Sequence, residues 1–254
     1  MGKTIFLDVG CADTSIMISG SNYFMVDCYD PASYFQYLPK GKRITGLFIT
    51  HQHRDHFSGM GYLADNGYSI DYLIYSPYER RRGDNSVEYD EWEEFNSYRH
   101  YFVGKGTETR SPYRQDDFDN PWWKTIGVKI WMLGPAKSIS TADTRKLHDA
   151  SLVFHVEMGA RKCLFTGDAS DENLNFIAKT TRNFCEDILH ASHHGSINGA
   201  DLEFIKKCAA KHTVISTKSG VHDMLPHPTA LKRYNDHTGK VYRTDADGTL
   251  SCDF

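Results

Sequence analysis

One six-residue run, His51 to His56, constrains this chain more than any other feature of its sequence. The run reads His-Gln-His-Arg-Asp-His, and four of its six side chains can ligate a metal ion. It follows Ile44–Thr50, whose β-branched and aromatic residues predict a buried strand. It precedes Phe57–Leu63, which is typical of the start of a helix. The run is therefore expected on a strand-to-helix loop, where a rigid scaffold can point several side chains at one place.

The run contains enough ligands to serve two ions. We expect His51 and His53 to converge on a first ion, while Asp55 and His56 turn toward a second. An ordinary solvated loop rarely gathers three histidines and an aspartate in six positions, so we favour a metal site. Imidazole nitrogens and carboxylate oxygens in this mixture suit two divalent ions, Zn²⁺ or Mn²⁺.

A further carboxylate stands at the end of another predicted strand. Cys163–Thr166 is followed by Gly167 and Asp168, and a carboxylate at a strand end can bridge two ions with one oxygen on each. The alternative is that Asp168 caps the following helix, because aspartate is a favoured N-cap residue. The presence of the first run makes the ligand interpretation the stronger one.

Two more histidine positions complete the candidate site. His193 and His194 come before Gly-Ser in a tight loop after a strand, so one can ligate a metal while the other hydrogen-bonds a substrate oxyanion. The alternative for this pair is a solvated loop. His148 either supplies a third imidazole for the first ion or lies at the surface.

This ligand set predicts hydrolysis by a metal-bound hydroxide. Two ions about 3.5–4 Å apart lower the pKa of a bridging water toward neutrality and hold the oxygens of an in-line displacement. In this interpretation Asp55 binds and orients the nucleophile, and Asp168 holds the two ions together.

Strands and helices alternate in both halves of the chain, with several hairpins. This pattern predicts an α/β domain over residues 1–254, with two mixed sheets face to face and helices outside. Residues 77–123 differ, being rich in charged and aromatic side chains, with an amphipathic helix expected from about 86 to 102 and a loop from 104 to 120. We interpret this stretch as an insertion near the active-site mouth or as a surface for a protein partner. Near the end of the chain, segments 241–244 and 249–251 are expected to pair with each other.

Composition excludes some classes of protein. No apolar run approaches the roughly 18 residues that span a bilayer, and the first residues lack a signal-peptide core, which favours the cytoplasm and no membrane contact. Six scattered cysteines without a CxxC pair are expected to be reduced thiols. The net charge of −4 offers no general attraction to nucleic acid, so phosphate binding must come from local basic groups or from metal ions.

Taken in order, H-Q-H-R-D-H, T-G-D and H-H-G-S resemble the metallo-β-lactamase superfamily, and their arrangement resembles the nuclease-like domain of the competence protein ComEC. Val26-Asp27 is similar to the family motif whose aspartate supports the metal loop from behind. Two positions differ from the family: Gly10-Cys11-Ala12-Asp13 stands where Gly-Gln-Gly-Asp is usual, and His148 where Asn is frequent.

The resemblance implies an αββα sandwich and a distribution of ligands. His51 and His53 would hold the first ion, with Asp55, His56 and His194 on the second and Asp168 between the two. It also implies that His193 faces the scissile phosphate. His227 and Lys218 are candidates for binding the same substrate, although an exposed lysine is an equal alternative for Lys218.

Three functions remain open at this point. The leading hypothesis is a nuclease that cleaves DNA, with Arg80–Arg82 and Tyr78 as a strand-binding patch or, equally, as charges paired with nearby acids. The second is a hydrolase of a small phosphodiester or other ester, such as a phosphorylcholine-like ester or a cyclic nucleotide. The third is an interaction subunit with a vestigial site, docked on a larger assembly through residues 77–123.

Overall fold

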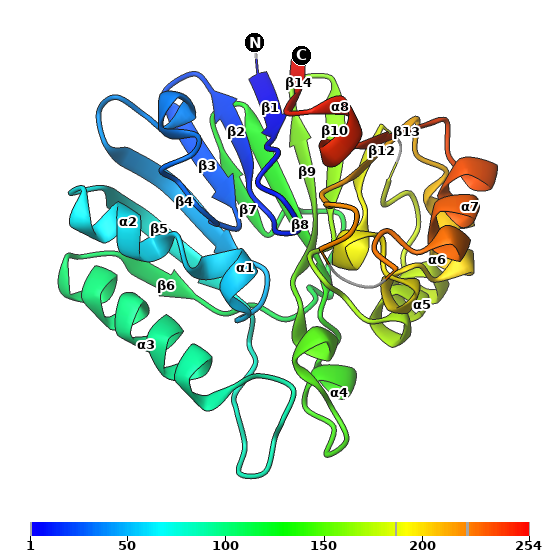
Figure 1. The fold of residues 1–254 in the computed structure, drawn as a ribbon, viewed down its shortest axis with the longest axis horizontal. Helices are drawn as coiled ribbons and strands as arrows, with labels where there is room; N and C mark the ends of the chain where they lie inside the picture. The colour runs from blue at the N-terminus through cyan, green and yellow to red at the C-terminus, as the bar shows by residue number, and fades with distance from the viewer. Residues whose placement is uncertain (1, 186, 222–223, 254) are drawn as a thin grey trace.

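Two seven-stranded β-sheets pack face to face in the computed structural model, which describes residues 2–185, 187–221 and 224–253 (Figure 1). In spatial order, the first sheet contains β14 (Leu250–Asp253), β1 (Gly2–Phe6), β2 (Ser15–Ser19), β3 (Asn22–Val26), β4 (Arg43–Ile49), β5 (Ser69–Tyr75) and β6 (Glu108–Arg110). The second contains β13 (Lys240–Arg243), β12 (His212–Ile215), β11 (Ile188–His190), β10 (Arg161–Phe165), β9 (Val153–Met158), β8 (Val128–Gly134) and β7 (Trp123–Thr125).

Aromatic side chains fill the space between the two sheets. Phe48 of β4 and Phe154 of β9 are fully buried and stack across the interface, with their ring centroids 4.7 Å apart. Alternate residues of each strand point to this side, because side chains in a strand alternate between its faces. The opposite faces of both sheets are also apolar and therefore need a second cover.

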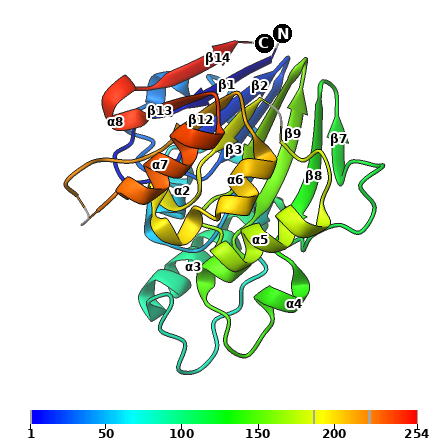
Figure 2. The same ribbon diagram turned by 90° about the vertical axis from the view of Figure 1, so that its right-hand side faces the viewer.

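Helices supply that cover on both outer faces. The first sheet is covered by α1 (Arg54–Phe57), α2 (Met60–Asp65) and α3 (Tyr89–Gly104), and the second by α5 (Asp171–Thr180), α6 (Leu202–Cys208) and α7 (Pro228–His237), which lie side by side in Figure 2. Short elements complete the chain: α4 (Lys137–Ser140), α8 (Thr244–Asp247), η1 (Phe35–Tyr37), η2 (Leu147–Ala150), η3 (Ser192–Gly195) and η4 (Ile197–Gly199). The predicted αββα sandwich is confirmed.

Part of the 77–123 stretch is built into the first layer. α3 buries Phe95 and Phe102 against the outer face of the first sheet. The prediction of a loop over 104–120 is wrong at β6, which pairs with β5 in parallel register. The open edge of β5 supplies the hydrogen-bonding partner, and this partner lies too far away in the sequence to leave a local signal. The interpretation of the stretch as an insertion stays a prediction.

The prediction that segments 241–244 and 249–251 pair with each other is also wrong. β13 continues the second sheet beside β12, whereas β14 crosses to the first sheet and pairs with β1. The short helix α8 lies between them and carries the chain from one sheet to the other. The C-terminal strand therefore ties the two ends of the described chain together.

The expectation of reduced thiols fails for one pair of cysteines. Cys185 and Cys208 form a disulfide, with their α-carbons 4.9 Å apart, and both side chains are buried in the core that the second sheet shares with its helices. Cys11, Cys28 and Cys163 are free thiols. Among the described residues, no helix has the length and apolar character needed to cross a membrane.

Candidate metal centre

The motifs converge because they follow parallel strands. β4 runs parallel to β3 and β5, and β10 runs parallel to β11, so the loops after β4, β10 and β11 leave the same edge of the sandwich. Backbone hydrogen bonds join these loops: Leu152 N donates to Thr50 O at 2.9 Å, and His193 N donates to Gly167 O at 3.0 Å. The histidine run only partly occupies a loop, since α1 begins at Arg54 rather than at Phe57.

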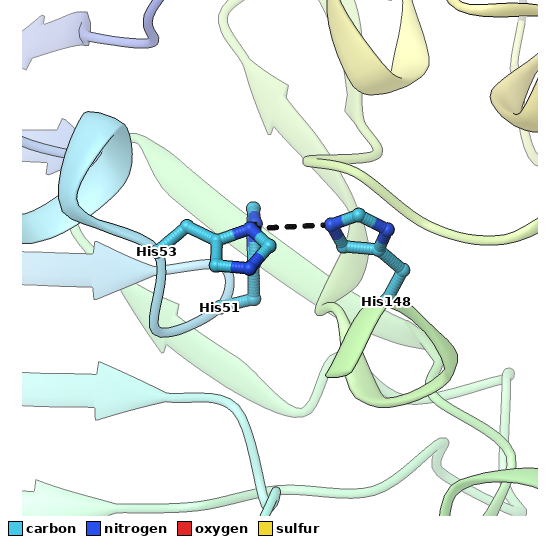
Figure 3. A group of neighbouring side chains, drawn as sticks. All are labelled: His51, His53 and His148. Carbon is cyan, nitrogen blue, oxygen red and sulfur yellow. Dashed lines mark hydrogen bonds between the residues drawn. The ribbon is translucent and has the colours of Figure 1, made fainter. Parts of the chain in front are cut away.

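Three histidines form a first ligand cluster (Figure 3). The Nδ1 atom of His53 lies 3.1 Å from Nε2 of His51 and 3.3 Å from Nε2 of His148. The Asp168 Oδ2 atom is 3.8 Å from the His51 nitrogen and 3.9 Å from that of His148. Three nitrogens and a carboxylate oxygen at these separations fit one four-coordinate ion, and His148 faces the cluster rather than the surface.

A second cluster lies on the other side of the same aspartate. His56 Nε2 is 3.4 Å from Oδ1 of Asp168 and 3.8 Å from Oδ2 of Asp55. His194 Nε2 lies 3.3 Å from that Asp55 oxygen. Among the described residues, neither His56 Nε2 nor Asp168 Oδ1 has a hydrogen-bond partner, although both are buried. Buried polar atoms left this way are expected where a cation lies between them, so the donors present fit a second divalent ion.

Asp13 was missed as a site residue by the sequence reasoning, although the Gly10–Asp13 segment was noted. Its carboxylate is buried without a hydrogen bond among the described residues. One oxygen is 3.8 Å from Nδ1 of His56, and the other is 3.4 Å from Nε2 of His190 and 4.0 Å from Nδ1 of His194. These Nδ1 atoms point away from Asp168, so Asp13 places negative charge behind the second cluster.

Outer hydrogen bonds fix the orientation of the imidazole rings. Asp27 accepts a bond from His56 Nδ1 at 2.8 Å and is itself held by the Thr50 backbone and hydroxyl at 2.7 and 2.8 Å. His53 Nε2 bonds Ser86 O at 3.0 Å, and His194 Nδ1 bonds Ser216 O at 3.0 Å. Each bond occupies the ring nitrogen that faces away from the cluster, which leaves the other nitrogen free to ligate.

Close steric contacts explain why glycine stands at the middle position of T-G-D. Gly167 has φ +46°, and a Cβ atom there would lie 2.5 Å from Thr50 Cβ and 2.6 Å from Ser151 Oγ. Only glycine permits this close approach, which brings Asp168 between the clusters. His193 and His194 also have positive φ values, 52° and 51°, and strained backbone of this kind in non-glycine residues concentrates at functional sites.

The two clusters differ in their protonation before any metal binds. Burial lowers the pKa of His51 well below its usual value and lowers that of His148 to about 3, so both imidazoles are neutral. Burial also opposes charge on His56, but Asp168, Asp27 and Asp55 overcome it and raise the pKa of His56 to about 10. Burial likewise opposes charge on His194, but Asp168, with Asp13 and Asp55, overcomes it and raises the pKa of His194 well above its usual value.

This difference predicts proton release at one cluster. At pH 7 the second ion must displace protons from His56 and His194, so we expect about two protons released and an affinity that rises with pH. Titration calorimetry of the metal-free protein with Zn²⁺ in buffers of different ionisation enthalpy measures this number. A His148→Ala control should retain the release, because His148 is already neutral. Binding heats that do not depend on the buffer would contradict the assignment of protons to His56 and His194.

The other predicted substrate residues lie at different distances from the clusters. His193 Nε2 is 3.7 Å from Asp168 Oδ2, and its ring packs edge-on against His148, so it stands at the mouth of the centre. Lys218 lines a groove that also contains Asp55. His227 donates its backbone N–H to Gly195 O, and its Nδ1 caps α7 by accepting from Thr229 N, so it supports the loop behind His194.

Comparison with known protein families gives an independent result. The sequence profile of the Metallo-beta-lactamase superfamily matches residues 11–209, which include the histidine run, T-G-D and H-H-G-S. ComE operon protein 3 of Bacillus subtilis is 31% identical over 108 residues, which cover 42% of this chain and 14% of that protein. Recombination protein 2 of Haemophilus influenzae is 25% identical over 132 residues, 52% of this chain and 16% of that protein. The chain thus spans a small part of both relatives.

A solved structure supports the fold. The metallo-beta-lactamase fold protein YhfI from Bacillus subtilis superposes with a TM-score of 0.59 over 99% of this chain and 100% of its own, at 17% identity. At this identity the likeness extends to the arrangement of sheets and helices only.

Proposed function

This chain belongs to the metallo-β-lactamase superfamily, and we propose that it is a metal-dependent phosphodiesterase, a nuclease that cleaves DNA. The observation that carries the proposal is the pair of ligand clusters that share Asp168. His51, His53 and His148 would hold the first ion, and Asp55, His56 and His194 the second. Two divalent ions at such a site make water acidic enough to attack at neutral pH and neutralise a phosphodiester.

The residues of the chain then have separate tasks. Asp55 is the most exposed carboxylate of the two clusters, with 36% of its side chain accessible, and it is therefore placed to orient the attacking water. Asp168, with 3% of its side chain accessible, fixes the spacing between the clusters. His193 is hydrogen-bonded to neither cluster, and 23% of its side chain is accessible, so it is placed to donate to a phosphate oxygen.

Two observations favour DNA over a small ester. The name of one relative, Recombination protein 2, refers to a process that acts on DNA. The order of the motifs in this chain resembles that of a nuclease-like domain. Ions held by these residues would supply positive charge beside a bound phosphate, so the overall charge of −4 would not oppose this substrate.

A panel of substrates tests the proposal. The purified protein, loaded with Mn²⁺ or Zn²⁺, should cleave DNA faster than bis-p-nitrophenyl phosphate, a cyclic dinucleotide or a phosphorylcholine ester, and a chelator should stop the reaction. Preference for one of the small substrates would replace the nuclease assignment with a small-ester hydrolase. Metal content without turnover of any substrate would favour an interaction subunit.

A further inference from the structure

A basic groove of about 710 Å³ adjoins the first ligand cluster. Its walls come from residues 81–86, before α3, and from residues 143–146, after α4. These two segments lie side by side at the bottom of Figure 1, and Arg81 of the first pairs with Asp143 of the second at 3.2 Å. One wall contacts the metal centre, and the other leads to it along the chain. Ser86 O accepts the bond from His53 Nε2 at 3.0 Å, and Lys146 lies two residues before His148. The groove therefore begins where the first cluster ends.

The charge of this groove is opposite to that of the whole chain. It contains Arg81, Arg82, Arg145 and Lys146 against the carboxylates Asp84 and Asp143. Arg145 forms the floor, because it is buried and pairs with Asp84 at 3.8 Å.

Two of the four cations are available to a ligand. Arg82 and Lys146 are exposed, and neither forms an ion pair with any residue in the described part of the chain. Exposed cations without carboxylate partners beside a phosphodiesterase site are suited to phosphates.

The aromatic partner of this patch is not the one that the sequence suggested. Tyr78 is buried and donates its hydroxyl to Asp84 at 2.5 Å, so it cannot stack on a base. Tyr89, at the start of α3, is 61% exposed, and the Arg80 guanidinium lies 5.4 Å from its ring. An exposed ring beside an arginine is the kind of surface on which unpaired bases stack.

A second groove lies at the opposite cluster. It has a volume of about 550 Å³ and is lined by Asp55 together with Gly10, Tyr29 and Lys218. In the described structure Lys218 has no carboxylate partner, whereas Arg54 in the same groove is neutralised by Asp90 and Glu94. One groove thus opens beyond His53 and His148, and the other beyond Asp55.

We infer that one DNA strand lies across the centre and occupies both grooves, so that cleavage needs nucleotides on both sides of the broken bond. This inference rests on the proposed function. The ligands between the grooves are recessed, since the side chains of His51 and His56 are fully buried, and a flexible single strand can bend its phosphate into such a recess. A strand bound on both sides does not need a free end, so the enzyme is an endonuclease.

A closed circle of single-stranded DNA tests the mode of cleavage. We expect the Mn²⁺-loaded protein to linearise and then fragment the circle, since a circle offers no end. Bis-p-nitrophenyl phosphate is assayed beside it. Turnover of the small diester with an intact circle overturns the inference and leaves the phosphodiesterase proposal standing. Absence of metal-dependent turnover with both substrates overturns the proposed function itself. Faster cleavage of duplex than of single-stranded circles contradicts the single-strand path.

Charge reversal tests the grooves themselves. Arg82→Glu, Lys146→Glu and Lys218→Glu should each lower the ratio of kcat/KM for a 20-nucleotide strand to kcat/KM for the small diester by at least about tenfold. The matched control is Lys124→Glu, an exposed lysine on the edge strand β7, which should leave the ratio unchanged. The effect should also shrink as salt is raised, because it arises from phosphate contacts. Ratios that match the control for all three groove variants overturn the assignment of these surfaces.

Discussion

Asp168→Asn should abolish metal-dependent hydrolysis, with a loss of at least about 1,000-fold in kcat, equivalent to roughly 4 kcal/mol of transition-state stabilisation. The substitution keeps the shape of the side chain but removes its charge. One Asp168 oxygen faces the first cluster and the other lies 3.4 Å from His56 Nε2, so the neutral amide weakens both ion sites at once. The measurement is DNA cleavage in Mn²⁺, together with metal content by elemental analysis.

Two controls separate this effect from trivial causes. Asp236→Asn changes an exposed carboxylate that pairs with Lys232 on α7, and it should retain full activity and two ions per chain. Circular dichroism should show that Asp168→Asn keeps the native fold. Activity that survives the Asp168 substitution in a folded protein would mean that a contaminating nuclease produces the signal, or that the shared carboxylate is not the centre of the reaction.

The sequence alone predicts most of the ligands for a physical reason. His51, His53, Asp55 and His56 stand together on one short segment, so their common purpose is visible without any knowledge of the fold. The two mixed sheets and the outer helices were likewise foreseen, because each element carries its own hydrophobic period. The start of the helix Asp171–Thr180 likewise has a local cause, since Ser170 caps it by accepting from Asn173 N.

What sequence reasoning missed depends on contacts between distant residues. Asp13 lies behind the second cluster only because β1 and β2 bring the loop between them to the edge where β11 ends. A lone aspartate in that loop has no pattern that separates it from a turn residue. The pairing of β14 with β1 and the Cys185–Cys208 disulfide are set in the same way, by the closing of layers around a shared core.

The error at Tyr78 has the same cause, because the burial of its ring depends on contacts between distant residues. An aromatic residue beside three arginines is typical of a nucleic-acid surface, and the sequence contains no sign that this ring is buried. The structure shows it over the Arg145 guanidinium, with its hydroxyl on Asp84. Composition can therefore indicate a basic groove, but the fold decides which side chains form its floor and which remain free to contact a ligand.

Metal binding should raise the thermal stability of this protein more than any single substitution could. Without ions, the carboxylates of Asp55 and Asp168 lie within the second cluster and that of Asp13 lies behind it, and the protonated rings of His56 and His194 balance part of this negative charge. A ligand that binds only the folded state, and is present at a thousand times its Kd, adds about 4 kcal/mol per site to the free energy of unfolding. For a chain of this size, that is a rise in Tm of roughly 8–16 °C per site.

Differential scanning calorimetry in EDTA and in Zn²⁺ or Mn²⁺ measures this rise. Mg²⁺ at the same concentration should give a smaller shift, because it prefers oxygen ligands and these clusters are rich in imidazole. Asp168→Asn should lose most of the shift, whereas Asp236→Asn should keep it. Equal melting temperatures with and without ions, in protein that elemental analysis shows to be loaded, would mean that the ions bind the unfolded chain as well as the folded one. The clusters would then not be preformed, because a preformed site binds its ion far more tightly than the dispersed ligands of an unfolded chain can.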